Sequence, residues 1–191
     1  MFFSLFMVGL MVFSMFAYFI TSPDSANQLE YGDYEFEYRD LGGGAGVLVT
    51  DINGQEIEFQ SLPVQVTGLQ MDSAVVPLLR SAGQIALSSP TNLSPEDGAM
   101  VDYARLQLGL SIPRMFNAML EEDERYQLPV LGCEQATPQM PVMVFAYSNT
   151  TGVEVEGSCI IVNGEARDLM RAKDRIIFEY YDILNDGVVV E

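Results

Sequence analysis

The chain has 191 residues, of which 27 are Asp or Glu, nine are Lys or Arg and none is His, so its formal net charge is −18 at pH 7. This charge disfavours nucleic acids and anionic lipid surfaces as partners, because phosphate binding requires clusters of Lys and Arg. The lack of histidine removes Ser–His and Cys–His nucleophile pairs, imidazole bases and His-based zinc or iron sites. The sequence predicts no catalytic residues, no metal site and no cofactor.

The chain opens with a run of twenty residues that contains neither a charge nor a proline, MFFSLFMVGLMVFSMFAYFI. A helix of this length spans about 30 Å, the thickness of a bilayer core. A cleaved secretory signal is the alternative, although no basic residue precedes the run and the segments ending at Ala17 and Ala26 are poor cleavage sites. We expect a transmembrane anchor in the lipid bilayer, a linker, one globular domain and a tail, at residues 1–20, 21–29, 30–187 and 188–191.

A group of short strands is expected after the linker. Aromatic and charged residues alternate over residues 34–39 with the period of a half-buried strand. Two further strands, at residues 47–50 and 57–59, flank the hairpin dipeptide Asn53-Gly54, so the region is predicted to be a β-meander. The aromatic stripe of the first strand has two interpretations, part of the core or a binding surface for sugars or peptides. It consists of Tyr34, Phe36 and Tyr38.

The clearest helix start is Ser94-Pro95-Glu96-Asp97, which places a hydroxyl at the N-cap, proline at the first helical position and acids in the first turn. Apolar residues at helical spacing extend this helix to about Gly109. The other expected elements are a helix at 75–80, strands at 84–88, 111–119, 129–131, 141–147 and 158–162, and a closing helix at 165–184. The predicted fold class is α/β (α+β), with a mixed sheet and flanking helices after the meander.

Three features favour a domain outside the cytoplasm: acids directly after the span, two distant cysteines and two glycosylation sequons. The sequons begin at Asn92 and Asn149, and the cysteines are Cys133 and Cys159. A disulfide over this spacing would contribute about 3.5 kcal/mol of stability. A redox-active pair and two free thiols are the alternatives.

Acidic residues also raise the question of a calcium site. Asp51, Asn53 and Gly54 form only a fragment of a calcium loop, because the bidentate Glu of such loops is missing. The acidic run at residues 121–124 is typical of a solvated turn.

The segment LPVLGCEQATPQMPVMVFAYSN, followed by SCIIVNG and RAKDRIIFEYYDIL, resembles an uncharacterised family of single-span, surface-facing membrane proteins of small-genome archaea. The shared features are the apolar span, an aromatic strand like YEFEY, the stretch from Cys133 to Thr137 before Pro141-Val142, and Asp174-Arg175. The resemblance covers most of the chain. It implies a topology and brings no activity or site residues.

The element order of the C-terminal two thirds is similar to that of the thioredoxin fold. Strand, helix and strand are followed by a hairpin of the segments 141–147 and 158–162 and by a closing helix. Thioredoxin chemistry uses Cys-x-x-Cys at the start of the first helix, and residues 88–97 contain no cysteine. The likeness therefore implies a fold without its function.

The function expected from these features is a membrane-anchored, extracytoplasmic domain for protein interaction or cell-surface assembly, with a protein partner at the cell surface. A thiol–disulfide enzyme derived from a thioredoxin fold, or another envelope enzyme, is the alternative. A calcium-dependent adhesive module is a third hypothesis.

Overall fold

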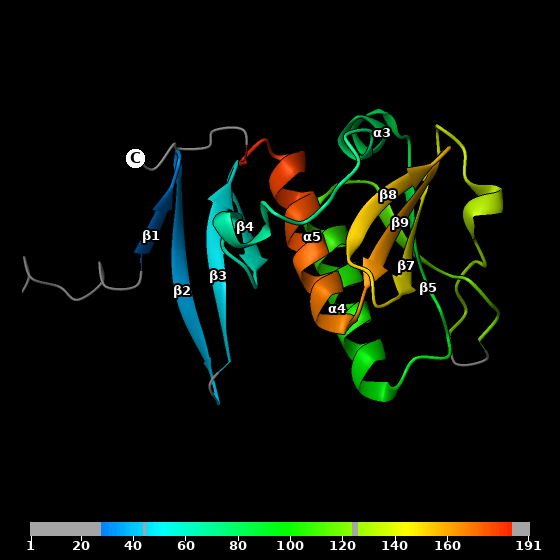
Figure 1. Cartoon of the computed structure of the whole chain (residues 1–191), viewed down its shortest axis with the longest axis horizontal. Coiled ribbons are helices and arrows are strands. Elements are labelled where there is room, and N and C mark those ends of the chain that lie inside the picture. Colours follow the sequence, from blue (N-terminus) through cyan, green and yellow to red (C-terminus); the bar gives the residue numbers. More distant parts are fainter. Residues whose placement is uncertain (1–27, 44, 124–125, 185–191) are drawn as a thin grey trace, which may run out of the picture.

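A computed structural model describes residues 28–43, 45–123 and 126–184 of the chain. In this part the domain has three layers, an antiparallel sheet, a pair of helices and a mixed sheet, as Figure 1 shows. The predicted α/β class and the N-terminal β-meander are confirmed. The expected anchor at residues 1–20 and tail at residues 188–191 lie outside the described residues. Among the described helices, none has the length and apolar character needed to cross a bilayer.

The first layer is a meander of four strands, each antiparallel to the next. They are β1 (Gln28–Tyr31), β2 (Tyr34–Gly42), β3 (Ala45–Ile52) and β4 (Gln55–Phe59). The turn between β3 and β4 requires positive φ, which Asn53 (57°) and Gly54 (82°) adopt. Strand β1 corrects the predicted linker, because residues 28 and 29 already pair with β2. Three of its four side chains are exposed, so it lacks the apolar alternation on which strand prediction depends.

The third layer is a five-stranded sheet in the order β6-β5-β7-β9-β8. Its strands are β5 (Ile85–Ser89), β6 (Met115–Met119), β7 (Val142–Tyr147), β8 (Gly152–Glu156) and β9 (Cys159–Gly164). The edge strand β8 is antiparallel to β9, and the other strand pairs are parallel. Every residue of β5 is buried, as expected for an inner strand of a sheet that is covered on both faces.

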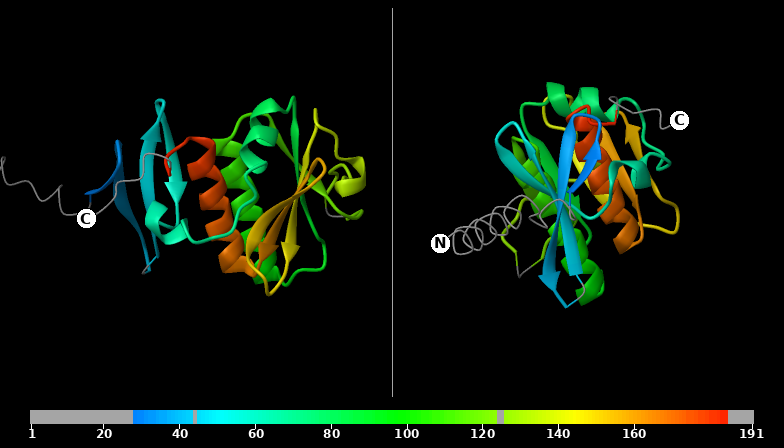
Figure 2. Two further views of the ribbon diagram at one scale, coloured as in Figure 1. Left: turned by 45° about the horizontal axis from the view of Figure 1, so that its top comes forward. Right: turned by 90° about the vertical axis from the view of Figure 1, so that its left-hand side faces the viewer.

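The helices α4 (Pro95–Ser111) and α5 (Ala166–Tyr180) form the middle layer. The left view of Figure 2 shows that they separate the two sheets. Helix α4 begins as predicted, because the Ser94 hydroxyl accepts a hydrogen bond from the backbone N–H of Asp97 at 3.1 Å. The short helices α2 (Pro63–Val66) and α3 (Val75–Ser81) lie in the connection from β4 to β5.

The predicted hairpin between residues 141–147 and 158–162 is wrong. These segments form β7 and β9, which are neighbours but run parallel. Strand β8, which sequence prediction missed, forms the hairpin with β9. The predicted strand at 129–131 is reduced to a single bridge between Met119 and Val130. The thioredoxin-like order of elements is therefore kept only in part, because the hairpin consists of β8 and β9, and β7, which precedes it, runs parallel to β9.

Most of the core lies between the two sheets, around α4 and α5. On the meander side, the rings of Phe59 and Phe178 stack with 4.3 Å between their centroids, and Phe36 meets both rings edge-on at 6.0 and 6.1 Å. Each such pair adds about 0.5–1.5 kcal/mol beyond the burial of its area. A smaller cluster, which includes Val142 and Val144, forms a separate core.

A buried ion pair joins the meander to the helical layer. Lys173, the only lysine of the chain, and Asp174 are both fully buried. Nζ of Lys173 lies 2.5 Å from Oδ1 of Asp174 and donates hydrogen bonds to Oε1 of Gln60 at 2.7 Å and to the carbonyl of Glu58 at 3.3 Å. Oδ2 of Asp174 accepts from the backbone N–H groups of Gln60 and Ser61 at 3.0 and 2.8 Å. The pair therefore fixes the end of β4 on α5.

Candidate ligand-binding site

One structural candidate for a site is a cavity at the carboxyl ends of two parallel strands. Strands β5 and β6 end at Ser89 and Met119, and α4 begins beside them at Pro95. The cavity between these ends has a volume of about 540 Å³. In α/β sheets, ligands bind preferentially at this edge. We call it the carboxyl-edge pocket and define it by Ser89, Ser94, Gly98, Arg105, Asn117 and Met119.

Arg105 forms the inner wall of the carboxyl-edge pocket, and only 4% of its side chain is exposed. Its guanidinium donates to the carbonyls of Leu87 and Ala118, in β5 and β6, at 3.0 and 2.7 Å, and to the hydroxyl of Ser89 at 2.8 Å. Burial lowers the pKa of Arg105, and the carboxylate of Asp102 at 2.9 Å opposes that shift. Because both terminal nitrogens are already bonded to the protein, Arg105 shapes the pocket and ties α4 to the two strands.

Three carboxylates lie in the pocket lining or are hydrogen-bonded to lining residues. The side chain of Asp102 is 55% exposed. Thr91, which lines the pocket, donates to Oε2 of Glu121 at 3.2 Å, and the hydroxyl of Ser94 donates to Oδ2 of Asp97 at 2.7 Å. Since the charge of Arg105 is balanced by Asp102, the remaining field is negative. It favours a neutral or positively charged ligand.

The remaining lining combines apolar surface with one free amide. Leu93, Val101 and Met119 supply apolar surface. The exposed side-chain amide of Asn117 forms no hydrogen bond with the described residues, which leaves its donors and its acceptor for a ligand. Apolar walls with a few convergent polar groups are typical of binding pockets.

The outer wall of the pocket comes from the connection between β6 and β7. Tyr126 and Leu128 of this connection line the pocket. The predicted disulfide is confirmed, since Cys133 and Cys159 are bonded with 5.1 Å between their Cα atoms. Cys133 lies in the 3-10 helix η2 (Cys133–Gln135) of the same connection, and Cys159 is the first residue of β9. The disulfide therefore fastens the connection that carries the pocket wall to β9, an inner strand of the sheet.

The structure separates the three residues of the aromatic stripe. Phe36 is fully buried in the core, so for this residue the core interpretation holds. Tyr34 is half-buried and donates a hydrogen bond to the carbonyl of Tyr181 at 3.5 Å. Tyr38 is 42% exposed and is the member of the stripe that presents most of its side chain to solvent. The stripe is not one continuous binding platform.

The predicted glycosylation residues Asn92 and Asn149 are both exposed. Asn92 lies in the loop between β5 and α4, whose neighbouring residues line the carboxyl-edge pocket, and Asn149 lies in the loop between β7 and β8. Their modification stays a prediction.

The fragment of a calcium loop at Asp51 is a hairpin turn in the structure. Oδ1 of Asp51 accepts a hydrogen bond from the backbone N–H of Gly54 at 2.8 Å. In the part of the chain that the structure describes, no group of three acidic or cysteine side chains is arranged to hold a metal ion.

Sequence reasoning missed Arg105 and Asn117. A charged residue between Ala104 and Leu108, on the apolar face of the predicted helix, was the signal available for Arg105. Asn117 carries no such signal, because its position depends on where β6 ends relative to α4.

Comparisons of the chain with protein-family models, with curated proteins and with solved structures find no match. The resemblance to single-span archaeal surface proteins therefore stays a prediction.

Proposed function

We propose that this chain is a membrane-anchored, extracytoplasmic domain that binds a partner protein at the cell surface without catalysing a reaction. The observation that carries the proposal is the carboxyl-edge pocket, at the position where α/β folds bind ligands. The negative field at its entrance selects a neutral or basic segment of the partner. Residues 1–20 would hold the domain at the bilayer through a single span.

The pocket wall is organised before a partner arrives. Arg105 holds the inner wall through its bonds to β5 and β6, and the disulfide fastens the connection that carries Tyr126 and Leu128. A preformed wall lowers the ordering cost of association. This rigidity suits a binding role.

Two glycines of α4 supply a matched pair of variants for testing the pocket. Gly98 lines the pocket, and a Cβ placed there meets only Leu93 at 3.9 Å, whereas a Cβ at Gly109 meets no atom within 4 Å. Replacing glycine in a helix by a good helix former stabilises it by up to about 1 kcal/mol. Gly98→Leu is expected to fill the pocket, and Gly109→Leu leaves it open, with neither variant unfolding the domain.

The measurement is crosslinking of intact membranes followed by mass spectrometry of the chain and its partners. We expect the wild type and Gly109→Leu to yield the same crosslinked partner and Gly98→Leu to lose at least nine tenths of it. Equal yields from the two leucine variants, or a wild-type chain without any partner at native expression, would contradict the proposal.

A thiol–disulfide enzyme is the second candidate, supported by the partly thioredoxin-like order of elements. Neither cysteine begins a helix of the middle layer, where such enzymes lower the pKa of their nucleophile. The two candidates differ in how easily the disulfide is reduced. A catalytic bond exchanges with mild thiol reagents, and a structural bond resists them.

A further inference from the structure

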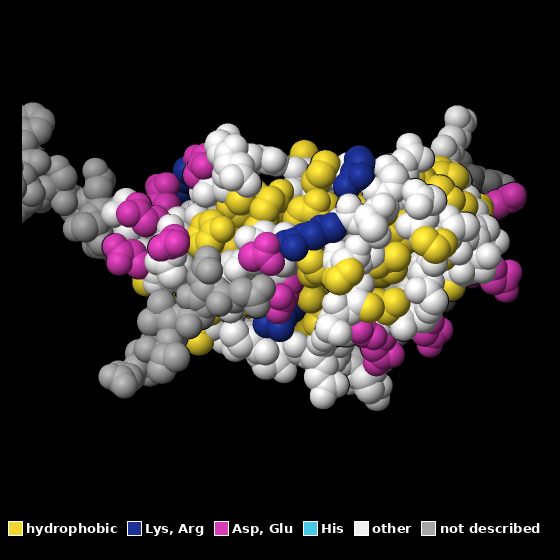
Figure 3. Space-filling view, turned by 90° about the horizontal axis from the view of Figure 1, so that it is seen from above, with side chains coloured by type: hydrophobic (Ala, Val, Ile, Leu, Met, Phe, Trp, Pro, Cys, Tyr) yellow, Lys and Arg dark blue, Asp and Glu magenta, His cyan; other side chains and the backbone are white. Residues whose placement is uncertain are grey.

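Basic residues are concentrated on one helix of this acidic chain. Four of the nine Lys and Arg residues lie in α5, and of these Lys173 is buried in its ion pair. On the face shown in Figure 3, Lys and Arg side chains lie mostly over the middle of the molecule, and Asp and Glu side chains gather mostly toward its two ends. Arg171 and Arg175 pair with Asp168 and Glu179 of the same helix, which leaves Arg167 as the basic side chain of α5 without an ion pair among the described residues.

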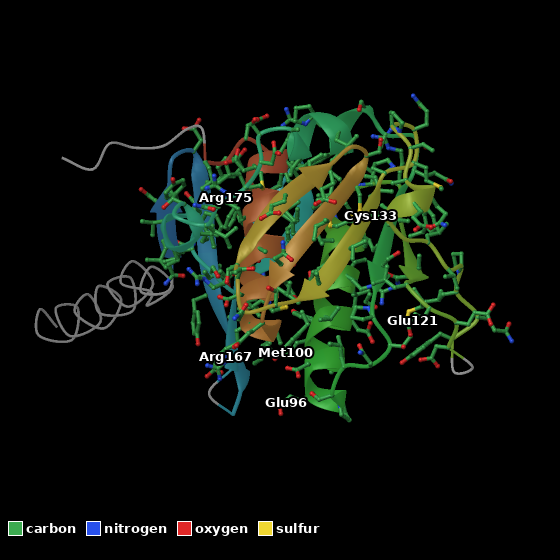
Figure 4. All side chains as sticks on the ribbon, turned by 45° about the vertical axis from the view of Figure 1, so that its right-hand side comes forward. Glu96, Met100, Glu121, Cys133, Arg167 and Arg175 are labelled. Atoms are coloured by element: carbon green, nitrogen blue, oxygen red, sulfur yellow. A yellow bond between two sulfur atoms is a disulfide. The ribbon has the colours of Figure 1, made fainter. Side chains whose placement is uncertain are left out.

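A second cavity, of about 650 Å³, lies beside this basic helix. We call it the Arg167 groove, and its lining residues are Gln60, Ser61, Gln65, Met100, Arg167, Met170 and Arg171. Figure 4 shows Arg167 and Met100 next to each other at neighbouring ends of α5 and α4. The lining contains two guanidinium groups and no carboxylate, although the chain has 27 acids. It shares no lining residue with the carboxyl-edge pocket.

The two arginines of the groove are available for a ligand in different ways. Arg167 is exposed and forms no hydrogen bond or ion pair with the described residues. Arg171 is held in place, because its guanidinium donates to the carbonyl of Gln65 at 3.0 Å and lies 3.4 Å from Oδ1 of Asp168. The two residues are one helical turn apart, so they face the same side of α5. Together they present one free and one oriented guanidinium.

The wall opposite α5 is fixed by the buried ion pair. Asp174 accepts hydrogen bonds from the backbone N–H groups of Gln60 and Ser61, and Lys173 holds the side chain of Gln60. The side chain of Gln65 accepts from the backbone N–H of Leu62 at 2.8 Å. The groove therefore has a rigid polar wall, and Met100 and Met170 supply an adaptable apolar surface.

We propose that the Arg167 groove binds an acidic peptide segment of a partner protein. Arg167 and Arg171 pair with carboxylates of the segment, since the planar guanidinium fork matches a carboxylate. Met100 and Met170 contact an apolar side chain between those carboxylates. A free inorganic anion would leave the methionines unused.

This groove goes beyond the carboxyl-edge pocket of the proposed function, because it selects the opposite charge and lies on a different surface. The two proposals fail separately. Loss of binding in Gly98→Leu concerns the pocket, and loss of binding in the arginine variants concerns the groove.

The test uses the full chain in an uncharged detergent and a fluorescent peptide of alternating Glu and Leu residues, with fluorescence anisotropy as the measurement. The variants are Arg167→Gln, Arg171→Gln and both together. Arg114→Gln is the matched control, because Arg114 is an exposed arginine outside both cavities. A peptide with Gln in place of Glu, and inorganic phosphate as a competitor, complete the set.

We expect the acidic peptide to bind the wild type and the Arg114→Gln variant equally and to bind the double variant at least tenfold more weakly, with binding falling as salt rises. The Gln peptide should not bind. The proposal is overturned if Arg114→Gln weakens binding as much as the double variant, or if the acidic peptide does not bind the wild type. Binding of phosphate without binding of the peptide also overturns it, because the groove would then be a site for free anions.

Discussion

The Asp174→Ala variant is expected to lose about 3–5 kcal/mol of its free energy of unfolding, because it leaves the buried ammonium of Lys173 without its carboxylate. It also removes the acceptor of the backbone N–H groups of Gln60 and Ser61, and unsatisfied buried donors are costly. Urea unfolding of the full chain in detergent, followed by circular dichroism, measures the loss. A change below about 1 kcal/mol would show that the pair does not hold the meander on α5.

The matched control removes both charges. Lys173→Met with Asp174→Asn keeps the volume of the two side chains and retains an acceptor near the N–H groups. We expect this double variant to be more stable than Asp174→Ala, since replacing a buried ion pair by neutral residues costs less than breaking it. If the double variant is the less stable of the two, the energetic role assigned to the unpaired charge is wrong.

The buried carboxyl also sets a pH dependence. Burial raises the pKa of Asp174 above its ordinary value of 3.8, with Lys173 and the hydrogen bonds from Gln60 and Ser61 opposing the shift. The folded chain therefore binds this proton more tightly than the unfolded chain. The protonated carboxyl therefore stabilises the folded chain. This contribution to the free energy of unfolding is complete when the pH is below the pKa of Asp174 in the unfolded chain, and it is lost as pH rises through the pKa of Asp174 in the folded chain. The free energy of unfolding of the wild type should therefore fall relative to that of Asp174→Asn as pH rises, and urea unfolding of both variants over a range of pH measures this change.

Removal of the disulfide is the second large effect. The variant with Cys133→Ser and Cys159→Ser is expected to lose about 3.5 kcal/mol, because a bond across a separation of 26 residues restricts the unfolded chain. The outer wall of the carboxyl-edge pocket should loosen with it, since the bond fastens the connection that carries Tyr126 and Leu128. Denaturant unfolding measures the first effect, and hydrogen exchange over residues 126–141 measures the second.

The same bond separates the two proposed functions. As a structural crosslink it should stay intact in a glutathione buffer of the extracytoplasmic potential. Unchanged stability of the serine variant, together with rapid reduction in that buffer, would contradict the structural role and favour the thiol–disulfide candidate.

Some helix and turn positions could be predicted because they depend only on residues that are neighbours in the sequence. The start of α4 follows from Ser94 and Pro95, and the turn of the meander follows from Asn53 and Gly54, because each depends only on neighbouring residues. The disulfide was predicted from the spacing of the two cysteines and from the expected extracytoplasmic location.

Pairing between distant segments could not be predicted in the same way. The chain runs from β7 into the short edge strand β8, turns back as β9, and so places β9 parallel to β7. Nothing in the sequence of β8 indicates this pairing. The burial of Arg105 depends on carbonyls of Leu87 and Ala118, which β5 and β6 bring together only in the folded sheet. The carboxyl-edge pocket depends on the same strand ends, so the site could be described only from the structure.

The proposed position of the domain outside the cytoplasm is tested most directly by labelling intact cells with a membrane-impermeant maleimide. Cys133 is exposed and Cys159 is buried, so Cys133 is the residue that should react once the bond is reduced. We expect no labelling of untreated cells and labelling of Cys133 after an impermeant reductant is added. Labelling that requires lysis of the cells, without any reductant, would place free thiols inside the cell and contradict an exported, disulfide-bonded binding domain.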